Sequence, residues 1–336
     1  MNTAPLALSM GDPAGIGPEI TVQAWSALRE TGPVFMVIGD CVSLTSAANR
    51  DGVSVEKISD PADAARIFAR AIPVLDIPLR APVVAGEPSP AHAELIVRWI
   101  ETGAALALSG AVAGLVTAPI AKAPLYAAGF RFPGHTEFLA ELVAQCPYDG
   151  ARGPVMMLTA AGLRVTLATI HLPISAVPSA LSIETIVNTG LVTAQALQRD
   201  FGINVPRLAV SGLNPHAGED GSLGREELDI IGPAIRALRD LGIEAFGPFP
   251  ADTLFHEEAR KSYDTVLCMY HDQALIPVKM LDFFGGVNVT LGLPIVRTSP
   301  DHGTAFNIAG RGLARADSLI AATRLARTIA DRRTAA

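Results

Sequence analysis

The sequence is poor in features that mark several classes of protein. It has only 3 cysteines in 336 residues, and no two of them are spaced as Cys-x-x-Cys. This excludes a disulfide mini-protein and favours a reducing compartment. No apolar run reaches the roughly 18 residues of a membrane-spanning helix, and the first residues lack the basic and apolar segments of a signal peptide. We therefore expect a cytoplasmic protein with no membrane partner.

Positive charge is also scarce. The chain carries 26 Lys and Arg against 33 Asp and Glu, a formal net charge of −7, and its basic residues form no run longer than Arg332-Arg333. Binding to a nucleic acid duplex needs a concentrated cationic face, so we expect no nucleic acid partner. A small anionic ligand is compatible with this charge, because a few local cations can outweigh a negative total.

Two common glycine-rich nucleotide motifs, G-x-G-x-x-G and G-x-x-x-x-G-K-[ST], are absent from the sequence. The first loop, Gly11 to Glu19, nevertheless joins an apolar run to a helix-like segment, with Pro18 in its first turn. Its backbone N–H groups could bind an anion. The alternative is a tight turn that needs small residues.

Length and composition indicate an ordered α/β protein. The chain is longer than a typical single domain of about 150 residues, and 49% of its 336 residues are hydrophobic. Apolar runs of strand length alternate with helix-length segments, a pattern typical of parallel strands covered by helices. The runs are 5–10, 34–39, 114–118, 154–159, 164–170, 207–213 and 265–270, and the clearest helices are 91–108, 182–200, 224–240 and 317–333.

Three histidines follow the last three of these apolar runs: His171, His216 and His271. Open α/β sheets bind ligands at the carboxyl ends of their strands. We therefore expect these imidazoles to converge and to hold a divalent cation with positions left open for substrate. Asp252 and Asp272 could add carboxylate oxygens. For any one of the histidines alone, the alternative is a structural role.

Segment 134–137 forms a second polar site candidate. Thr136 could cap the helix that follows, and the N–H groups of that helix, together with His135, could bind a phosphate or a carboxylate. Capping alone would explain Thr136 but not His135.

Segment 270–312 is the most unusual stretch, because many polar residues alternate there with glycine, proline and short apolar runs. Such a density is costly as structure alone. We interpret Lys279 and Arg297 as anion-binding groups; the alternative for either one is a solvated surface charge.

Taken together, the motifs resemble the 4-hydroxythreonine-4-phosphate dehydrogenase family, metal- and NAD(P)-dependent oxidoreductases of pyridoxal 5′-phosphate (vitamin B6, pyridoxine) biosynthesis. The resemblance covers nearly the whole chain. It is carried by MGDPAGIGPE, PGHTEFLAE, GLNPHAGEDGSLGREE, PADTLF, YHDQALIPVK, GGVNVTLGLP and RTSPDHGTAFNIAG.

The resemblance implies roles for individual residues. The family binds one divalent metal ion per subunit, zinc, magnesium or cobalt, and its ligands correspond to His171, His216 and His271. The implied substrate-binding residues are His135, Thr136, Lys279, Asn288 and Arg297. The general base stays open among the catalytic candidates Asp252, Asp272 and Lys279. The family usually has Asp where this chain has Asn307, so we suspect a cofactor loop there and leave NAD or NADP open.

The resemblance also implies a fold and an assembly. The family has two α/β/α domains with a cleft between them, like the isocitrate and isopropylmalate dehydrogenases, which bind a dinucleotide without the conventional Rossmann fingerprint. We expect residues 1–130 and 285–336 to form the first domain. Residues 131–284 would form the second, with the metal ligands and the dimer contacts. The active unit would be a homodimer with a shared active site.

The implied reaction is oxidation of 4-phosphooxy-L-threonine at C3, with NAD or NADP as acceptor, to 2-amino-3-oxo-4-phosphooxybutanoate, which decarboxylates to 3-amino-2-oxopropyl phosphate. Related dehydrogenases act instead on 4-phospho-D-threonate or 4-phosphoerythronate, and the metal site does not separate them. A metal-dependent hydrolase or aldolase would use the same histidines but would turn over without nicotinamide. A metal-binding protein without activity would leave the polar loops after residue 270 unexplained.

Overall fold

The computed structural model describes residues 3–335, which form two compact units. The first contains the described residues up to Pro147 together with Pro294–Ala335, and the second is Tyr148–Leu293. The sequence-based division put the changes of domain after residues 130 and 284, whereas the compact units change after residues 147 and 293. Residues 1, 2 and 336 of the expected first domain lie outside the described residues.

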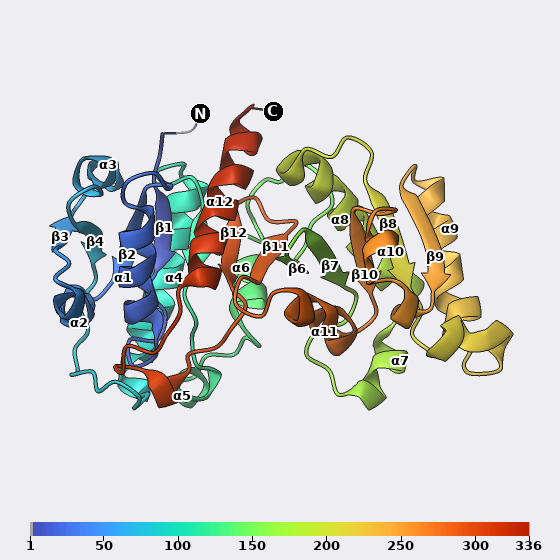
Figure 1. The fold of residues 1–336 in the computed structure, drawn as a ribbon, viewed down its shortest axis with the longest axis horizontal. Helices are drawn as coiled ribbons and strands as arrows, with labels where there is room; N and C mark the ends of the chain where they lie inside the picture. Colours follow the sequence, from blue (N-terminus) through green and yellow to red (C-terminus); the bar gives the residue numbers. More distant parts are fainter. Residues whose placement is uncertain (1–2, 336) are drawn as a thin grey trace. The chain divides into compact units, whose positions relative to one another are not determined.

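The first unit is built on a sheet of parallel strands in the order β3-β4-β2-β1-β5-β12 (Figure 1). The strands β1, β2, β5 and β12 are buried at every position, as expected of parallel strands covered on both faces. Their bounds are Leu6–Ser9 (β1), Phe35–Gly39 (β2), Val55–Ile58 (β3), Ile72–Asp76 (β4), Leu115–Thr117 (β5) and Arg297–Pro300 (β12).

Helices cover this sheet. The helices α1 (Gly17–Leu28) and α12 (Asp317–Ala335) pack against each other, and α12 also contacts β12, β5 and β1. The helix α4 (Ala93–Leu108) packs on β1, β2 and β5. Trp25 and Trp99 are buried, and each donates its indole N–H to a backbone carbonyl. The other helices are α2 (Cys41–Ala48), α3 (Ala64–Ile67), α5 (Lys122–Ala127) and α6 (His135–Leu142).

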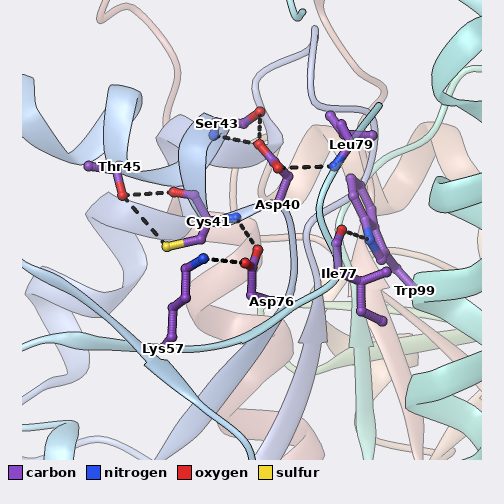
Figure 2. A network of polar contacts seen from close by, with 9 residues as sticks. All are labelled: Asp40, Cys41, Ser43, Thr45, Lys57, Asp76, Ile77, Leu79 and Trp99. Carbon is purple, nitrogen blue, oxygen red and sulfur yellow. Dashed lines mark hydrogen bonds and ion pairs between the residues drawn. The ribbon is translucent and has the colours of Figure 1, made fainter. Parts of the chain in front are cut away.

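A network of polar contacts closes the carboxyl ends of β2 and β4 (Figure 2). The Asp40 carboxylate accepts hydrogen bonds from the N–H and the hydroxyl of Ser43, at 2.7 and 2.6 Å, and from the N–H of Leu79 at 3.1 Å. Asp76 Oδ2 lies 2.6 Å from Lys57 Nζ. These carboxylates therefore cap α2 and order the chain after β4, and we assign them to the scaffold.

The second unit has a mixed sheet in the order β11-β6-β7-β10-β8-β9. The strands β7, β10, β8 and β9 are parallel, while β6 is antiparallel to both β7 and β11. The expectation of parallel strands throughout is wrong here, because β6 and β7 form a hairpin whose turn, Ala161-Gly162, has positive φ angles of 47° and 83°. The bounds are Val155–Ala160 (β6), Leu163–Leu167 (β7), Arg207–Ser211 (β8), Glu244–Phe249 (β9), Thr265–Cys268 (β10) and Val287–Leu291 (β11).

Long helices pack on this second sheet too. The helix α8 (Ile183–Phe201) begins where the sequence predicts, because the Ser182 hydroxyl accepts a hydrogen bond from Thr185 N at 3.0 Å. It contacts β11, β6, β7 and β8, whereas α11 (His271–Leu281) contacts β6, β7 and β10. The remaining helices are α7 (Val177–Ala180), α9 (Gly232–Asp240) and α10 (Glu257–Arg260).

The core of the second unit lies beneath α11, where Leu158, Val165, Val266 and Val278 form part of one buried cluster. A π-helical turn, Glu227–Ile231, leads into α9, so the helix predicted over 224–240 is present in two parts. Within residues 3–335, no helix combines the length and the apolar character needed to cross a membrane.

Candidate functional site

Three histidines of the second unit follow neighbouring strands of its sheet. The strands β7, β10 and β8 lie next to one another in that order and run parallel. His171, His271 and His216 respectively follow their carboxyl ends. The prediction that these three residues leave the ends of strands is confirmed, and the strands prove to be adjacent.

His171 and His271 lie together, with their ring centroids 5.7 Å apart. They line a pocket of about 470 Å³ that Asp272 also borders. His271 Nδ1 is 2.7 Å from Asp272 Oδ1. A carboxylate in that position favours the tautomer with the proton on Nδ1, which leaves Nε2 with a free lone pair. This pair therefore has the donor chemistry of a metal site.

His216 borders a different pocket, together with Glu219, Glu227 and Arg236. Within residues 3–335, no group of three or more His, Cys, Asp or Glu side chains is arranged to hold a metal ion. The structure thus brings two of the three predicted ligands together and carries the third on the loop of the next strand. The metal-binding role of all three remains a prediction.

The backbone around His216 is unusual. Five successive residues, from His216 to Asp220, have positive φ angles between 42° and 84°, and only Gly218 among them is a glycine. A left-handed conformation costs an L-residue roughly 1–2 kcal/mol. Strain of this kind persists only where surrounding contacts hold it, and it is concentrated at functional sites. The sequence does not predict this turn, because four of its five residues individually disfavour the left-handed conformation.

The candidate bases of the second unit lie at different places around these loops. Asp252 is exposed on a short helix, Ala251–Thr253, that contacts the turn Pro215–Gly221. Asp272 is paired with His271. Lys279 lies in the last turn of α11, with its ammonium 5.2 Å from the centre of the Phe283 ring. The structure therefore associates Asp252 with His216 and Asp272 with His271.

The first unit contains a buried cationic site at the start of β12. Arg297 is 3% exposed and donates a hydrogen bond from Nη2 to the Thr117 hydroxyl at 2.7 Å. Burial lowers the pKa of Arg297 to about 10, and the nearby Glu137 carboxylate partly opposes that shift. Arg297 remains charged at neutral pH, so it is a cation inside an apolar unit.

His135, the first residue of α6, faces this cation. Burial, and secondly the charge of Arg297, lower the pKa of His135 well below its usual 6.5, so the imidazole is neutral at pH 7. Its Nε2 atom is buried and has no hydrogen-bond partner among the described residues. A buried polar atom without a partner is costly. An anionic or hydroxyl-bearing ligand would satisfy both His135 and Arg297.

Thr136 and Asn288 complete the predicted substrate-binding residues. The expected capping role of Thr136 is wrong, because α6 begins at His135 after Gly134, which puts the buried Thr136 inside the first turn. Asn288 lies on β11, and its Oδ1 is buried without a hydrogen-bond donor from the described part of the chain.

The first loop is a tight turn packed against a distant segment of the same unit. Asp12 N and Ile16 N donate to backbone carbonyls, the latter to that of Thr304 at 3.0 Å, and Ala14 N donates to Asp12 Oδ1 at 3.0 Å. These N–H groups already have acceptors, which favours the tight turn over the anion site. The contact with Thr304 brings the loop beside the exposed Asn307, so the suspected cofactor loop has the first loop as its neighbour.

Comparison with known proteins gives one family along the chain. Residues 32–326 match the family described as "Pyridoxal phosphate biosynthetic protein PdxA". The chain is 69% identical over 333 residues to the 4-hydroxythreonine-4-phosphate dehydrogenase of Caulobacter vibrioides, with 99% of each chain covered. It is 54% identical over 334 residues to the protein of the same name from Maricaulis maris, with 98% of each covered.

Solved structures agree. A 4-hydroxythreonine-4-phosphate dehydrogenase from Klebsiella pneumoniae matches with a TM-score of 0.85 at 40% identity, over 97% of this chain and 99% of that one. A terephthalate 1,2-cis-dihydrodiol dehydrogenase from Burkholderia xenovorans matches with a TM-score of 0.65 at 30% identity, over 97% and 98%. The resemblance inferred from the motifs is thereby confirmed.

Proposed function

This chain belongs to the PdxA family of pyridoxal phosphate biosynthetic proteins, and on that premise we propose that it is an oxidoreductase that oxidises 4-phosphooxy-L-threonine at C3. Oxidised NAD or NADP, when bound, would supply the hydride acceptor for C3, and a base of the protein takes the C3 hydroxyl proton. The resulting 2-amino-3-oxo-4-phosphooxybutanoate loses carbon dioxide to give 3-amino-2-oxopropyl phosphate. The product is a precursor in pyridoxal 5′-phosphate biosynthesis.

The observation that carries this proposal is the position of the three histidines after adjacent parallel strands. Two of these imidazoles, those of His171 and His271, lie together, and with His216 from the loop of the adjacent strand they would hold a divalent cation such as zinc, magnesium or cobalt, one ion per subunit. When bound, such a cation supplies Lewis-acid polarisation of the substrate's oxygen atoms. The short contact between His271 and Asp272 supports this role, because a carboxylate on the second ring nitrogen orients an imidazole ligand.

The anionic groups of the substrate need cations and N–H donors. In the first unit, Arg297, His135 and Thr136 supply a charged guanidinium, an imidazole nitrogen without a partner among the described residues, and a hydroxyl. In the second unit, Lys279 and Asn288 supply an ammonium and a side-chain amide. We assign these five residues to substrate binding, with the phosphate and carboxylate as their targets.

The base that removes the hydroxyl proton is one of three residues. Asp272 is engaged with His271, which favours an orienting role for its carboxylate. Asp252 and Lys279 are then the stronger candidates, Asp252 because its helix contacts the turn that carries His216. The dinucleotide is assigned to the loop around Asn307.

We further propose that the enzyme is a cytoplasmic homodimer with a shared active site. Apolar side chains surround the histidine pair and face solvent: Leu172 is 43% exposed, Ile174 71% and Ile276 67%. Met280, 75% exposed, lies one turn after Ile276 on α11. An exposed apolar patch of this kind favours a protein partner. The three cysteines are free thiols, which suits a reducing compartment.

A substrate panel tests the proposal. The purified protein is incubated with a divalent metal and NAD or NADP, and the formation of reduced nicotinamide is followed by absorbance with each substrate. The substrates are 4-phosphooxy-L-threonine, 4-phospho-D-threonate and 4-phosphoerythronate. We expect turnover of the first, at least tenfold less for the others, and loss of turnover in His216→Ala. The other two acids belong in the panel because one solved relative is named for a different substrate.

Two results would contradict the proposal. Preference for 4-phospho-D-threonate or 4-phosphoerythronate would assign the chain to a related dehydrogenase. Turnover of a phosphorylated hydroxy acid without any nicotinamide would assign it to a metal-dependent hydrolase or aldolase.

A further inference from the structure

The carboxylate of Glu227 lies against the turn that carries His216. Glu227 is 5% exposed and is the first residue of the π-helical turn that precedes α9. Its Oε1 accepts hydrogen bonds from the backbone N–H groups of Leu213 and Asn214, at 2.8 and 2.7 Å. A buried carboxylate therefore holds the segment directly before His216.

The second oxygen of this carboxylate is equally engaged. Glu227 Oε2 accepts a hydrogen bond from the Asn214 side-chain amide at 2.9 Å. A Cβ atom added to Gly218 would lie 2.6 Å from the same oxygen, and the φ angle of Gly218 is +84°. Only glycine lets the left-handed turn close on the carboxylate in this way. Glu227 thus contacts the turn both before and after His216.

The entry to the turn is tied to the start of α11. Gly212 N donates to Phe249 O at 2.8 Å, and Gly212 O accepts a hydrogen bond from Gln273 Nε2 at 2.7 Å. Gln273 is buried, and its Oε1 accepts from Met269 N at 2.7 Å. Gln273 lies two residues after His271, so the loops of His216 and His271 share one hydrogen-bonded connection.

We propose that Glu227 is a positioning residue that holds the turn carrying His216 in the conformation from which this imidazole serves as the third metal ligand; the proposal rests on the metal site proposed above. The turn opposes the intrinsic preference of four of its five residues. Its own backbone hydrogen bonds, such as that from Ala217 N to Asn214 O at 3.1 Å, join uncharged groups. Three N–H groups donate to one anionic acceptor, and hydrogen bonds to charged groups are the stronger kind. Loss of this acceptor should release the turn and move the His216 imidazole.

Cobalt binding in the absence of substrate and nicotinamide measures this role directly. Co²⁺ is titrated into wild-type protein and variants, with calorimetry for the Kd and visible absorption for the ligand geometry, well below each Tm. Glu227→Gln keeps an acceptor for the two backbone N–H groups but turns an amide N–H₂ toward that of Asn214. We expect its Kd to rise about tenfold and that of Glu227→Ala about a hundredfold, the range for residues that orient a metal ligand.

Asp229→Asn is the matched control. Asp229 belongs to the same π-helical turn, is exposed and pairs with Arg225, so this variant also loses one carboxylate charge from the element. We expect a wild-type Kd and a wild-type Co²⁺ spectrum. An equal loss of affinity in Asp229→Asn would show that net charge matters rather than the turn, and would overturn the proposal.

A scaffold role for Glu227 predicts a different result. A lower Tm with unchanged Kd and unchanged Co²⁺ spectrum in the Glu227 variants would overturn the positioning role and leave the metal site intact. Wild-type protein that binds no Co²⁺ would instead remove the proposed metal site, and this inference with it. If the Glu227 variants do not fold, Gly218→Ala perturbs the same contact from the turn; unchanged affinity there would also overturn the proposal.

Discussion

Replacement of Arg297 by methionine is expected to stabilise the ligand-free protein while damaging the enzyme. Burial lowers the pKa of Arg297 from its usual value to about 10. At about 1.4 kcal/mol per pKa unit, holding this charge inside the folded protein costs about 3 kcal/mol. Methionine has no charge to bury, although the variant loses the hydrogen bond to Thr117, worth about 1 kcal/mol. The free energy of unfolding should therefore rise by about 2 kcal/mol.

The size of the effect depends on pH in a defined way. Because the pKa of Arg297 is lower in the folded state, the cost is fully present below about pH 10 and diminishes as pH rises above it. Urea denaturation at pH 7 should show the full difference. Arg70→Met is the matched control: Arg70 is exposed and paired with Glu56, so that change should alter stability by less than about 1 kcal/mol.

The catalytic activity of Arg297→Met should fall, although its stability rises. Loss of a charge-assisted hydrogen bond costs on the order of 1.5–3 kcal/mol, which lowers kcat/KM about ten- to a hundredfold in Arg297→Met without affecting metal affinity. If the variant unfolds more easily than wild type at pH 7, Arg297 is a satisfied structural cation and the reasoning fails. An unchanged kcat/KM would remove it from the substrate site.

Three further outcomes are expected. The pKa of His135 is well below 6.5 in the folded state, so wild type should lose up to about 1.4 kcal/mol of stability per pH unit below pH 6.5, because the unfolded state takes up the proton. His135→Gln should flatten the decline in Tm between pH 7.5 and 5. Parallel curves of Tm against pH for the variant and wild type would contradict the burial argument. Asn307→Asp places a carboxylate where it would repel the 2′-phosphate of NADP, so KM for NADP should rise about tenfold and that for NAD little; an unchanged ratio would move the cofactor loop elsewhere. Finally, because His171 and His271 lie together in one chain, inactive His171→Ala and His271→Ala chains, mixed and allowed to exchange, should recover no activity. Recovery of about a quarter of wild-type activity would show instead that the two ligands of each site come from two subunits, because about half the dimers are mixed and each then has one intact site.

The apolar runs predicted the central strands because burial on both faces requires apolar residues. The apolar runs did not predict the short strand Arg297–Pro300, because it contains no large apolar residue although every position is buried. Two of its side chains bond to distant partners: Arg297 donates to the Thr117 hydroxyl, and Thr298 donates to the carbonyl of Ala322. No local pattern reveals such partners, so a strand made buried by tertiary hydrogen bonds is invisible to periodicity.

The antiparallel strand pair shows a second limit. The runs 154–159 and 164–170 predict two strands, and the overall alternation with helices predicts that they belong to a parallel sheet. Only four residues separate the two runs, too few for the crossover that a parallel pair needs, since such a connection takes a dozen residues or more. The length of the connection between the two runs therefore indicates an antiparallel pair. It is a stronger signal than the alternation of strands and helices along the rest of the chain.

The site shows where local rules and tertiary structure conflict. The rule that ligands bind at the carboxyl ends of strands located His171, His216 and His271 without any metal motif, because topology alone brings those ends together. It did not reveal the left-handed turn after Pro215, since four of its five residues individually disfavour that conformation. What over-determines the turn is the buried carboxylate of Glu227, which follows it in the sequence and reaches back to it. The left-handed conformation costs free energy, and a buried carboxylate is needed to maintain it. Packing alone does not explain why the protein keeps such a turn, and this is the physical reason to look for function at His216.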